Sequence, residues 1–476
     1  MKYWRCLPIM ALAVILTACA ARIPKSTETP LRGNAPVSTA QAGQGAIPAG
    51  EWPAADWWQR YEDPALDQLI RSALRTAPSL ATADARFAAA RQSVRVTGAA
   101  TGVQIEANAT LQRQRLSDNG LFPPEFLGFN WYNQADLGLA FSYSFDWWGK
   151  QRAGIAAAVD EARAAQAERS AAALLLSTSI AESYFGWQAD QQRLLLAREQ
   201  LLLVERQALV TGRRIAAELD SADNARLAAQ HSAASREQIA MLEGSARLRI
   251  VTLAALLALP AGELPPLTVR ELPALPTMLP ADLRLDLIAR RPDITASRWR
   301  VEAARSNIKV ARADYFPDVS VRALAGLSSI EIGNLLEAGS AVPAISAAVH
   351  LPLFDSGLRD ARYGEVQARL ASAIASYDET VVNAARETGA AAATCLQLAA
   401  QRVERQRQLD ESSAYAAAAV ARVRAGTSDI RPQLSAQIAA NAERDALTLL
   451  QAAAVSADIT LQRALGGGYT FTEESP

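Results

Sequence analysis

A long internal duplication constrains the fold of this chain more than any other feature. The segment that begins at Ala77-Pro78 aligns without a gap on the segment that begins at Arg291-Pro292, 214 residues later. Further along, Phe145–Gly149 matches Leu353–Gly357 at an offset of 208 residues. A period this long is neither a short solenoid repeat nor a heptad. Half of the molecule is therefore used twice, and we expect one pseudo-symmetric structure with its function on the shared axis.

Charge and cysteine content exclude some classes of protein. The net charge of −1 over 476 residues gives no indication of nucleic-acid binding. Of the three cysteines, Cys6 and Cys19 belong to the N-terminal segment discussed next, so a disulfide framework is not expected. Cys395 lies in an Ala-rich helical stretch, where we interpret it as a small apolar packing residue.

The N-terminus has the pattern of a secreted lipoprotein. Lys2 and Arg5 precede an apolar run that is too short for a bilayer, which requires about 20 residues. The Leu16–Cys19 stretch resembles a bacterial lipobox, so we expect residues 1–18 to be a signal peptide and Cys19 to carry a diacylglycerol and an N-acyl lipid. An ordinary signal peptide with a chance cysteine is the alternative. Residues 19–50, without periodicity, predict an extended tether.

The period of hydrophobic residues changes twice within each half. In the first half, residues 56–74 and 79–98 have helical spacing, with Pro78 as a first-turn proline. Residues 103–112 and 135–145 then alternate strictly, which predicts two strands within residues 103–146. The second half repeats the pair within residues 317–353, with Arg322 and His350 on the face opposite the apolar one. The halves are thus residues 51–260 and 281–466, with a proline-rich linker at 261–280 and a tail at 467–476.

A very long helical hairpin follows each strand pair. The first is predicted over residues 149–259, with a turn near Glu218–Ser221, and the second over residues 357–465, with a turn at Gly426–Ser428. At 1.5 Å per residue, each outgoing helix is roughly 100 Å long. This length exceeds that of helices in ordinary globular domains.

The strands have one uniformly apolar face and about the length that a bilayer requires. Four strands cannot close a barrel, because about eight are the practical minimum, and an open edge inside lipid is not allowed. The strands therefore either stay in water as two hairpins or are pooled by several chains. Three chains would supply twelve.

Several motifs, in this order and together with the duplication, resemble the outer-membrane efflux lipoproteins of the NodT branch of the TolC family. The resemblance covers essentially the whole mature chain and is carried by Trp57–Ile70, Arg290–Ile294, Ala311–Pro317, Leu351–Gly357 and Ala464–Tyr469. It implies a mainly α-helical homotrimer with a twelve-stranded membrane β-barrel and a periplasmic α-helical barrel.

The resemblance also implies a function and partners. Such a protein is the exit duct of a tripartite efflux pump, not an enzyme. It works with a periplasmic adaptor (membrane fusion) protein and an inner-membrane transporter, usually a proton-driven drug exporter. No cofactor is expected other than the lipid on Cys19.

In such proteins the hairpin tips close the pore and open like an iris. The positions that correspond to the adaptor-contact tips are Glu218, Leu219, Gly426 and Thr427. The positions that correspond to the gate are Arg424, Asp429, Ser435, Asp220 and Asp223. Two residues depart from the family pattern: Glu218 replaces a common glycine, and Ser435 replaces an acidic residue. We therefore expect Asp429 and Asp220 to supply the gate carboxylates, with Arg424 as a link partner.

Catalytic and metal-binding patterns are absent from the sequence. His231 and His350 have no neighbours at metal-ligand spacing, and there is no phosphate-binding loop or nucleophile elbow. Gly466–Gly468 follows a helical stretch and is interpreted as a helix stop. Two other functions remain open: a protein-secretion duct of the same fold, and a structural periplasmic lipoprotein.

Overall fold

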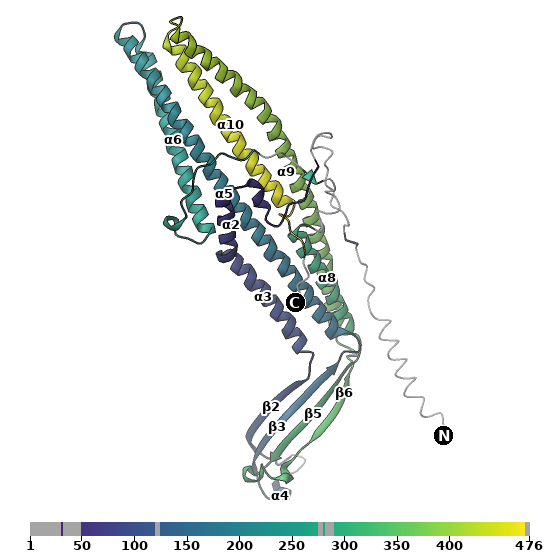
Figure 1. Cartoon of the computed structure of the whole chain (residues 1–476). Coiled ribbons are helices and arrows are strands. Elements are labelled where there is room, and N and C mark those ends of the chain that lie inside the picture. The colour runs from purple at the N-terminus through teal and green to yellow at the C-terminus, as the bar shows by residue number, and fades with distance from the viewer. Residues whose placement is uncertain (1–29, 32–48, 120–123, 275–278, 281–289, 472–476) are drawn as a thin grey trace.

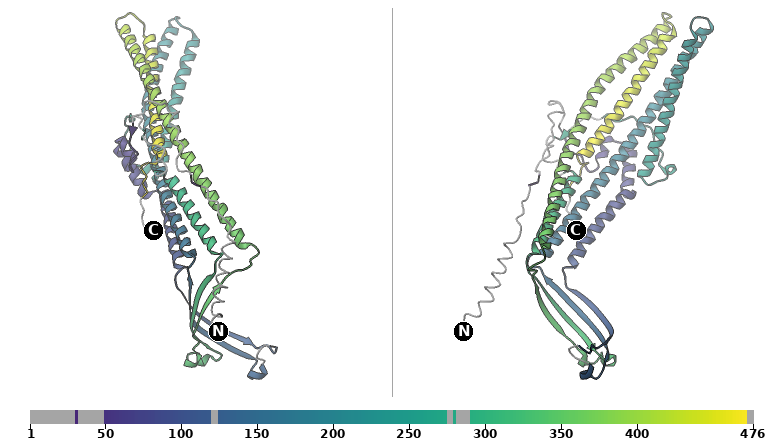
Figure 2. Two further views of the ribbon diagram at one scale, coloured as in Figure 1. Left: turned by 90° about the vertical axis from the view of Figure 1, so that its right-hand side faces the viewer. Right: turned by 180° about the vertical axis from the view of Figure 1, so that it is seen from behind.

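The structure, a computed structural model, describes residues 30–31, 49–119, 124–274, 279–280 and 290–471. The predicted signal peptide, Cys19 and most of the predicted tether lie outside these residues. The molecule is elongated, with two helical hairpins at one end and a β-sheet at the other (Figure 1 and Figure 2). Within the described residues, no helix has the length and apolar character needed to cross a membrane.

The two halves have helices of identical length. The short helices have 22 residues each, the outgoing helices of the hairpins 67 each, and the returning helices 35 each. In that order they are α3 (Pro78–Ala99) and α8 (Pro292–Ala313), α5 (Lys150–Ala216) and α9 (Leu358–Arg424), and α6 (Ala222–Leu256) and α10 (Ile430–Ala464). Pro78 and Pro292 each occupy the first turn of their helix, where the missing N–H has no helical partner to lose.

The segment before α3 differs from the single helix expected over residues 56–74. It forms a 3-10 turn, η3 (Trp57–Tyr61), and a separate helix, α2 (Pro64–Thr76). Glu62 has a positive φ of 52°, and the Asp63 carboxylate caps α2 by accepting from the backbone N–H of Ala65 at 2.9 Å. The break occurs here because Pro64 lacks the N–H that a continuous helix would need.

A four-stranded antiparallel sheet forms the other end of the molecule. Its strands are β2 (Gln104–Arg115), β3 (Trp131–Phe145), β5 (Asp318–Ser329) and β6 (Ala344–His350), in the order β2-β3-β5-β6. The loops contain α4 (Pro124–Leu127), η5 (Ile332–Asn334) and η6 (Ala338–Ser340). The last strand was expected to reach residue 353 but ends at His350, because Pro352 cannot donate to a ladder. Strands β2 and β6 are the two edges, and each is paired on one side only.

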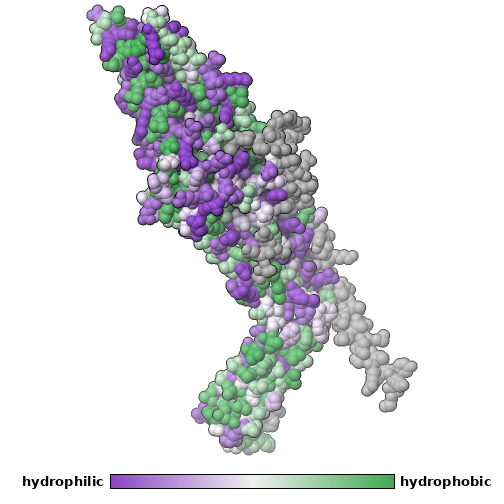
Figure 3. All heavy atoms as spheres, in the orientation of Figure 1, coloured by the Kyte–Doolittle hydropathy of each residue, from purple (hydrophilic) through white to green (hydrophobic). Residues whose placement is uncertain are grey.

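The register places apolar and polar residues on opposite faces of this sheet. One row across the four strands is Ile105, Phe141, Ala323 and Ile345; the adjacent row is Gln104, Ser142, Arg322 and Ser346. The apolar face is widely exposed, with Ile345 at 80%. Figure 3 shows the sheet end as mostly hydrophobic and the hairpin end as mainly hydrophilic. His350 lies opposite Asp318, in the polar register.

The linker and the end of the tether are more ordered than the sequence indicates. Ala49–Gly50 (β1) pairs in parallel with Leu279–Pro280 (β4), and Ala261–Glu263 forms a 3-10 turn, η4. The linker also crosses α5, where the Gln188 side chain accepts from the Arg270 backbone N–H at 2.8 Å and donates to the Thr268 carbonyl at 2.9 Å. The side-chain amide of Gln188 therefore supplies hydrogen-bond partners to a linker backbone that has no neighbouring strand here.

The main core lies where α5 meets α2, η3 and the far ends of α6 and α10 (Figure 1). Tyr184, Ile180 and Ile459 are completely buried there. Beyond this core, α5 packs against α6 of its own half and against α8 and α10 of the other half. The two halves therefore share one body.

Candidate functional site at the hairpin tips

The two hairpin turns lie together at the end of the molecule farthest from the sheet (Figure 1). The first turn joins α5 to α6 and the second joins α9 to α10. Each turn contains five residues, Ala217–Ser221 and Ala425–Asp429. They are equivalent positions of the duplication.

Both turns are Schellman motifs with a left-handed residue at the second position. In the first, Glu218 N–H donates to the Ile215 carbonyl at 2.9 Å and Leu219 N–H to the Arg214 carbonyl at 2.8 Å. In the second, the N–H groups of Gly426 and Thr427 make the same bonds at 3.0 Å. Glu218 has φ 58° and Gly426 has φ 70°. Glu218, which stands where the family commonly has glycine, thus adopts a positive φ that is unfavourable for a residue with a side chain.

Asp220 organises the first tip. Its carboxylate accepts from the Asn224 side chain, from the Ser221 backbone N–H at 2.9 Å and from Arg214 Nε at 3.4 Å. Arg214 also donates to the Leu219 carbonyl at 2.9 Å. The hydrogen bond from Asn224, followed by those from Ser221 and Arg214, lowers the pKa of Asp220. This carboxylate is therefore ionised at neutral pH.

Asp429 organises the second tip. Its Oδ1 caps α10 by accepting from the Arg431 backbone N–H at 2.8 Å, and its Oδ2 accepts two hydrogen bonds from the Arg431 guanidinium, at 2.8 and 3.1 Å. The Arg431 hydrogen bonds lower the pKa of Asp429, and the charge of Arg214 on the other tip lowers it further. Asp220 likewise contributes to a raised pKa of Arg431. The ion pairs of the two tips therefore interact electrostatically.

The predicted site residues divide into those with tip contacts and those without. Among the described residues, Asp220 pairs with Arg214 and Asp429 with Arg431, and no ion pair of Arg424 with either carboxylate is found. The link from Arg424 to a gate carboxylate therefore stays a prediction. Asp223 pairs with Arg226 at 3.1 Å, with the two side chains 85% and 82% exposed. Leu219 is 64% exposed, and Ser435 accepts from Gln207 of α5 at 3.4 Å. The structure brings in Arg214, Arg431 and Gln207, which the sequence analysis missed.

A row of polar contacts between α5 and α10 continues from the tips toward the middle of the molecule. Arg193 binds Asp445 in a bidentate manner at 2.7 and 3.1 Å, with both side chains largely buried. Asn441 donates to the Leu196 carbonyl at 2.9 Å and to the Gln200 side chain at 3.0 Å. These contacts hold the second hairpin against the first.

Other reactive groups are few in the described residues. They contain no cluster of three side chains that could hold a metal ion. Cys395 is buried, and burial raises the pKa of its thiol to about 12. A thiol in this state is a packing group and a poor nucleophile.

Known proteins of similar sequence show which family this chain belongs to. A family model described as outer membrane efflux protein matches residues 69–259 and 283–467, one match in each half of the duplication. The chain belongs to this family.

Curated relatives extend the match over nearly the whole chain. The multidrug resistance outer membrane protein MdtP of Escherichia coli O6:H1 is 32% identical over 426 residues, which cover 88% of this chain and 87% of the relative. MdtQ of Escherichia coli O157:H7 is 30% identical over 480 residues, covering 98% and 97%. The similarity to these multidrug resistance outer membrane proteins thus covers 88% and 98% of this chain.

Solved structures give the same fold. The outer membrane protein VceC of Vibrio cholerae superimposes with a TM-score of 0.77 at 30% identity, covering 88% of this chain and all of that one. The outer-membrane channel OprN superimposes with a TM-score of 0.83, covering 94% and 99%. The fold is therefore the TolC-like α-barrel and β-barrel fold. This protein is an outer-membrane efflux channel whose helical body extends into the periplasm, and the sequence-based prediction of its fold class and function is confirmed.

Proposed function

We propose that three copies of this chain assemble into one continuous exit duct. The observation that carries the proposal is the four-stranded sheet, which has one exposed apolar face and two edges that are each paired on one side only. Pairing of the β2 edge of one copy with the β6 edge of the next leaves no edge in lipid. The twelve pooled strands span the membrane, and six helical hairpins enclose a periplasmic tunnel.

The duct works as one component of a tripartite pump. A periplasmic adaptor protein contacts the hairpin tips at Glu218, Leu219, Gly426 and Thr427, and an inner-membrane transporter, proton-driven, supplies the energy. The named multidrug resistance relatives support small molecules, drugs among them, as the exported class. The polar face of the sheet supports a water-filled passage.

The tips act as the gate. In the closed state Asp220 and Asp429, paired with Arg214 and Arg431, hold the hairpins in their inward positions, while Ser435, Arg424 and Asp223 line the entrance. Adaptor binding separates the hairpins and opens the tunnel. The Arg431–Asp429 pair is about half exposed and the Arg214–Asp220 contact is long, at 3.4 Å, so each pair is weak by itself. Several of them must therefore be exchanged for adaptor contacts together.

Conductance tests the gate. Asp429→Ala should raise single-channel conductance in planar bilayers and sensitise cells to vancomycin, which is too large for a closed duct. Asp429→Ser is the matched variant, because serine keeps a helix N-cap but removes the charge. An open phenotype in both variants supports the gate link. Leakage from Asp429→Ala alone would assign the effect to helix capping, and unchanged permeability in both would remove Asp429 from the gate.

Crosslinking in cells tests the partners. Formaldehyde crosslinking of the full-length chain, followed by identification of co-purified proteins, should recover one adaptor and one transporter. Susceptibility of the deletion strain to a compound panel then gives the substrate class. Recovery of a peptide exporter, with unchanged drug susceptibility, would favour the protein-secretion duct. The absence of any pore in bilayers would favour the structural lipoprotein.

Lipidation of Cys19 is a separate part of the proposal. It rests on the lipobox-like Leu16–Cys19 stretch and on the outer-membrane location of the family. Intact-mass measurement of the purified protein should show loss of residues 1–18 and added mass for a diacylglycerol and an N-acyl chain. A mass equal to the cleaved, unmodified chain would exclude the lipid.

A further inference from the structure

The apolar face of the sheet becomes cationic at the end farthest from the helices. Along β2, alternate residues from Ile105 to Leu111 are apolar, but the next two positions on the same face are Arg113 and Arg115. Their cross-strand partners on β3 are Asn133 and Trp131. The face that carries Ile105 and Leu111, exposed by 60% and 68%, thus ends in two arginines beside an indole.

The depth of these arginines matches the outer boundary of a bilayer. Arg113 lies nine residues beyond Gln104, the helix-proximal end of β2. At about 3.3 Å per residue this is about 30 Å along the strand, and a tilt of 35–45° reduces it to about 23 Å along the membrane normal. The lipid-facing band of outer-membrane barrels is about 25 Å tall. Arg113 and Arg115 are therefore at the level of the outer-leaflet head groups.

Aromatic rings mark both boundaries of the same face. At the helix-proximal end, Tyr143, Phe145 and Trp147 form a row with ring centres 5.0 and 5.8 Å apart. At the far end, Trp131 is 53% exposed. Aromatic belts of this kind lie at the two membrane–water interfaces of membrane proteins. The arginines lie at and beyond the far belt, with their side chains on the lipid-facing side.

Among the described residues, nearby carboxylates do not fully neutralise the positive charges of Arg113 and Arg115. The Arg113 guanidinium carbon lies 5.5 Å from the centre of the Trp131 ring, and no hydrogen bond or ion pair of Arg113 is found among the described residues. Arg115 contacts Asp118 at 3.3 Å, with the two side chains 54% and 66% exposed, which is a weak, solvent-screened pair. A guanidinium that lies over an indole ring can still direct its N–H groups to the oxygens of an anion such as a phosphate.

We infer that Arg113 and Arg115 form a binding site for the phosphate groups of the phosphorylated glycolipid, lipid A, in the outer leaflet. The inference rests on the proposed insertion of the sheet in the outer membrane. Arginine forks match phosphate oxygens in a bidentate manner, while Ile105 and Leu111 below them contact the acyl chains. The ligand thereby fixes the vertical position of the barrel and the β2 edge. The polar-face arginine, Arg322, points to the opposite side and takes no part.

The site is tested with purified trimer in detergent and added lipid A. Because charge-assisted contacts to phosphate are lost, Arg113→Gln/Arg115→Gln should weaken lipid A binding, measured by native mass spectrometry or thermal shift, by at least about tenfold. Arg113→Lys/Arg115→Lys should recover part of it, because lysine binds phosphate as a point charge. The matched control Arg322→Gln should bind as the parent does. Trimer content and conductance are measured in all variants.

Each other outcome overturns the inference. Unchanged lipid A binding by the double glutamine variant would remove the two arginines from the site. Equal stabilisation by phosphatidylglycerol or by inorganic phosphate would replace lipid A with a general anion. If the double variant loses trimers while its remaining assembled fraction binds lipid A normally, the arginines contact the neighbouring copy and do not bind the lipid. If the parent forms no trimer or pore, the proposed function itself fails, which is distinguishable from a lipid defect in a conducting trimer.

Discussion

At the scale of single residues, Glu218 and Gly426 are the most informative pair. They occupy the same position of the same turn, with similar positive φ values, but only one of them is glycine. A side chain in the left-handed region costs about 1 kcal/mol. The first tip is therefore intrinsically easier to unfold than the second.

Glu218→Gly should stabilise the first tip by about 1 kcal/mol, because it removes this strain while both backbone bonds of the turn are kept. The expected result is about fivefold slower hydrogen exchange of the Leu219 amide. Gly426→Ala is the matched reverse change, since the added methyl group meets no atom within 4 Å and only the positive φ is affected. It should speed exchange at Thr427 by a similar factor. Unchanged exchange in both variants would show that neighbouring contacts, not φ, determine tip stability.

The tip carboxylates predict how the gate responds to pH. The pKa values of Asp220 and Asp429 are lowered by their hydrogen bonds with Asn224 and Arg431. A lowered folded-state pKa means that the contribution is complete above the unfolded value of about 3.9 and is lost as pH falls through the folded value. Conductance in planar bilayers should therefore stay constant from about pH 7 to 5 and rise only below about pH 4. An increase between pH 7 and 5 would assign gating to another group.

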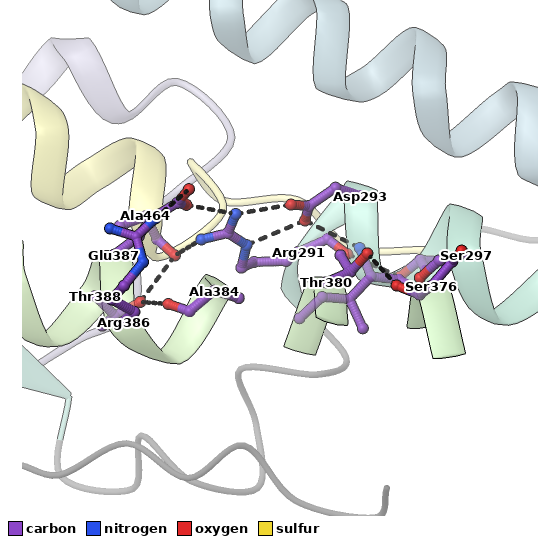
Figure 4. A network of polar contacts seen from close by, with 12 residues as sticks. Arg291, Asp293, Ser297, Ser376, Thr380, Ala384, Arg386, Glu387, Thr388 and Ala464 are labelled. Atoms are coloured by element: carbon purple, nitrogen blue, oxygen red, sulfur yellow. Dashed lines mark hydrogen bonds and ion pairs between the residues drawn. The ribbon is translucent and has the colours of Figure 1, made fainter. Parts of the chain in front are cut away.

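At the scale of elements, Arg291 joins the start of α8 to α9 and to the end of α10 (Figure 4). Its guanidinium binds Asp293 at 2.7 and 3.0 Å, Glu387 at 2.9 Å and the Ala464 carbonyl at 3.0 Å. The residue is 8% exposed, and these anions raise its pKa although burial opposes that change. The equivalent residue of the first half is Ala77, which instead lies in the apolar core.

Arg291→Ala should destabilise the protein by about 1.5–3 kcal/mol, because it removes charge-assisted hydrogen bonds to two half-exposed carboxylates and leaves a helix-end carbonyl without its partner. The lost stability is measured as a lower unfolding temperature of the purified trimer. Arg369→Ala is the control, since Arg369 makes an exposed pair with Glu365 within α9, and its loss should cost less than about 1 kcal/mol. Equal effects of the two changes would mean that the Arg291 network contributes no more than a surface pair.

The sequence predicts regular elements well and their exceptions poorly. The helical and alternating periods predict the two long hairpins and the two faces of the sheet, because each depends on local spacing. The break at Glu62–Asp63 was missed, since the apolar period continues across it and only Pro64 signals the stop. The β1–β4 pair joins residues far apart in the sequence, and neither strand has a pattern of its own.

The gate residues show the same limit of prediction from sequence. Asp220 and Asp429 could be selected because they are acidic and near the turns, but their partners could not. The Asp429–Arg431 pair depends on the cap geometry of α10, and the Arg214–Asp220 pair depends on the left-handed turn that brings the two residues together. A search for basic residues within six positions of each turn would have found both arginines.

At the scale of the whole molecule, successive residues of β3 alternate between the face assigned to lipid and the face assigned to the lumen. Leu139 is on the apolar face, paired with Ala107 and Ala325, and Ala140 is on the polar face, paired with Glu106 and Leu324. Both lie near the middle of the strand. Leu139 and Ala140 have different environments only if the sheet is part of a closed barrel, with water inside and lipid outside.

Leu139→Arg should therefore prevent stable assembly, because an arginine on the lipid face near the bilayer midplane costs about 2–4 kcal/mol per copy. Three copies multiply this cost in one trimer. Ala140→Arg adds the same charge one residue away and should assemble normally, since it faces water and lies beside Glu106. The measurement is the trimer fraction in isolated outer membranes, followed by bilayer conductance, in which the lumen arginine should shift ion selectivity toward anions. Equal assembly of the two variants would contradict a membrane-inserted sheet, and the reverse order would exchange the two faces.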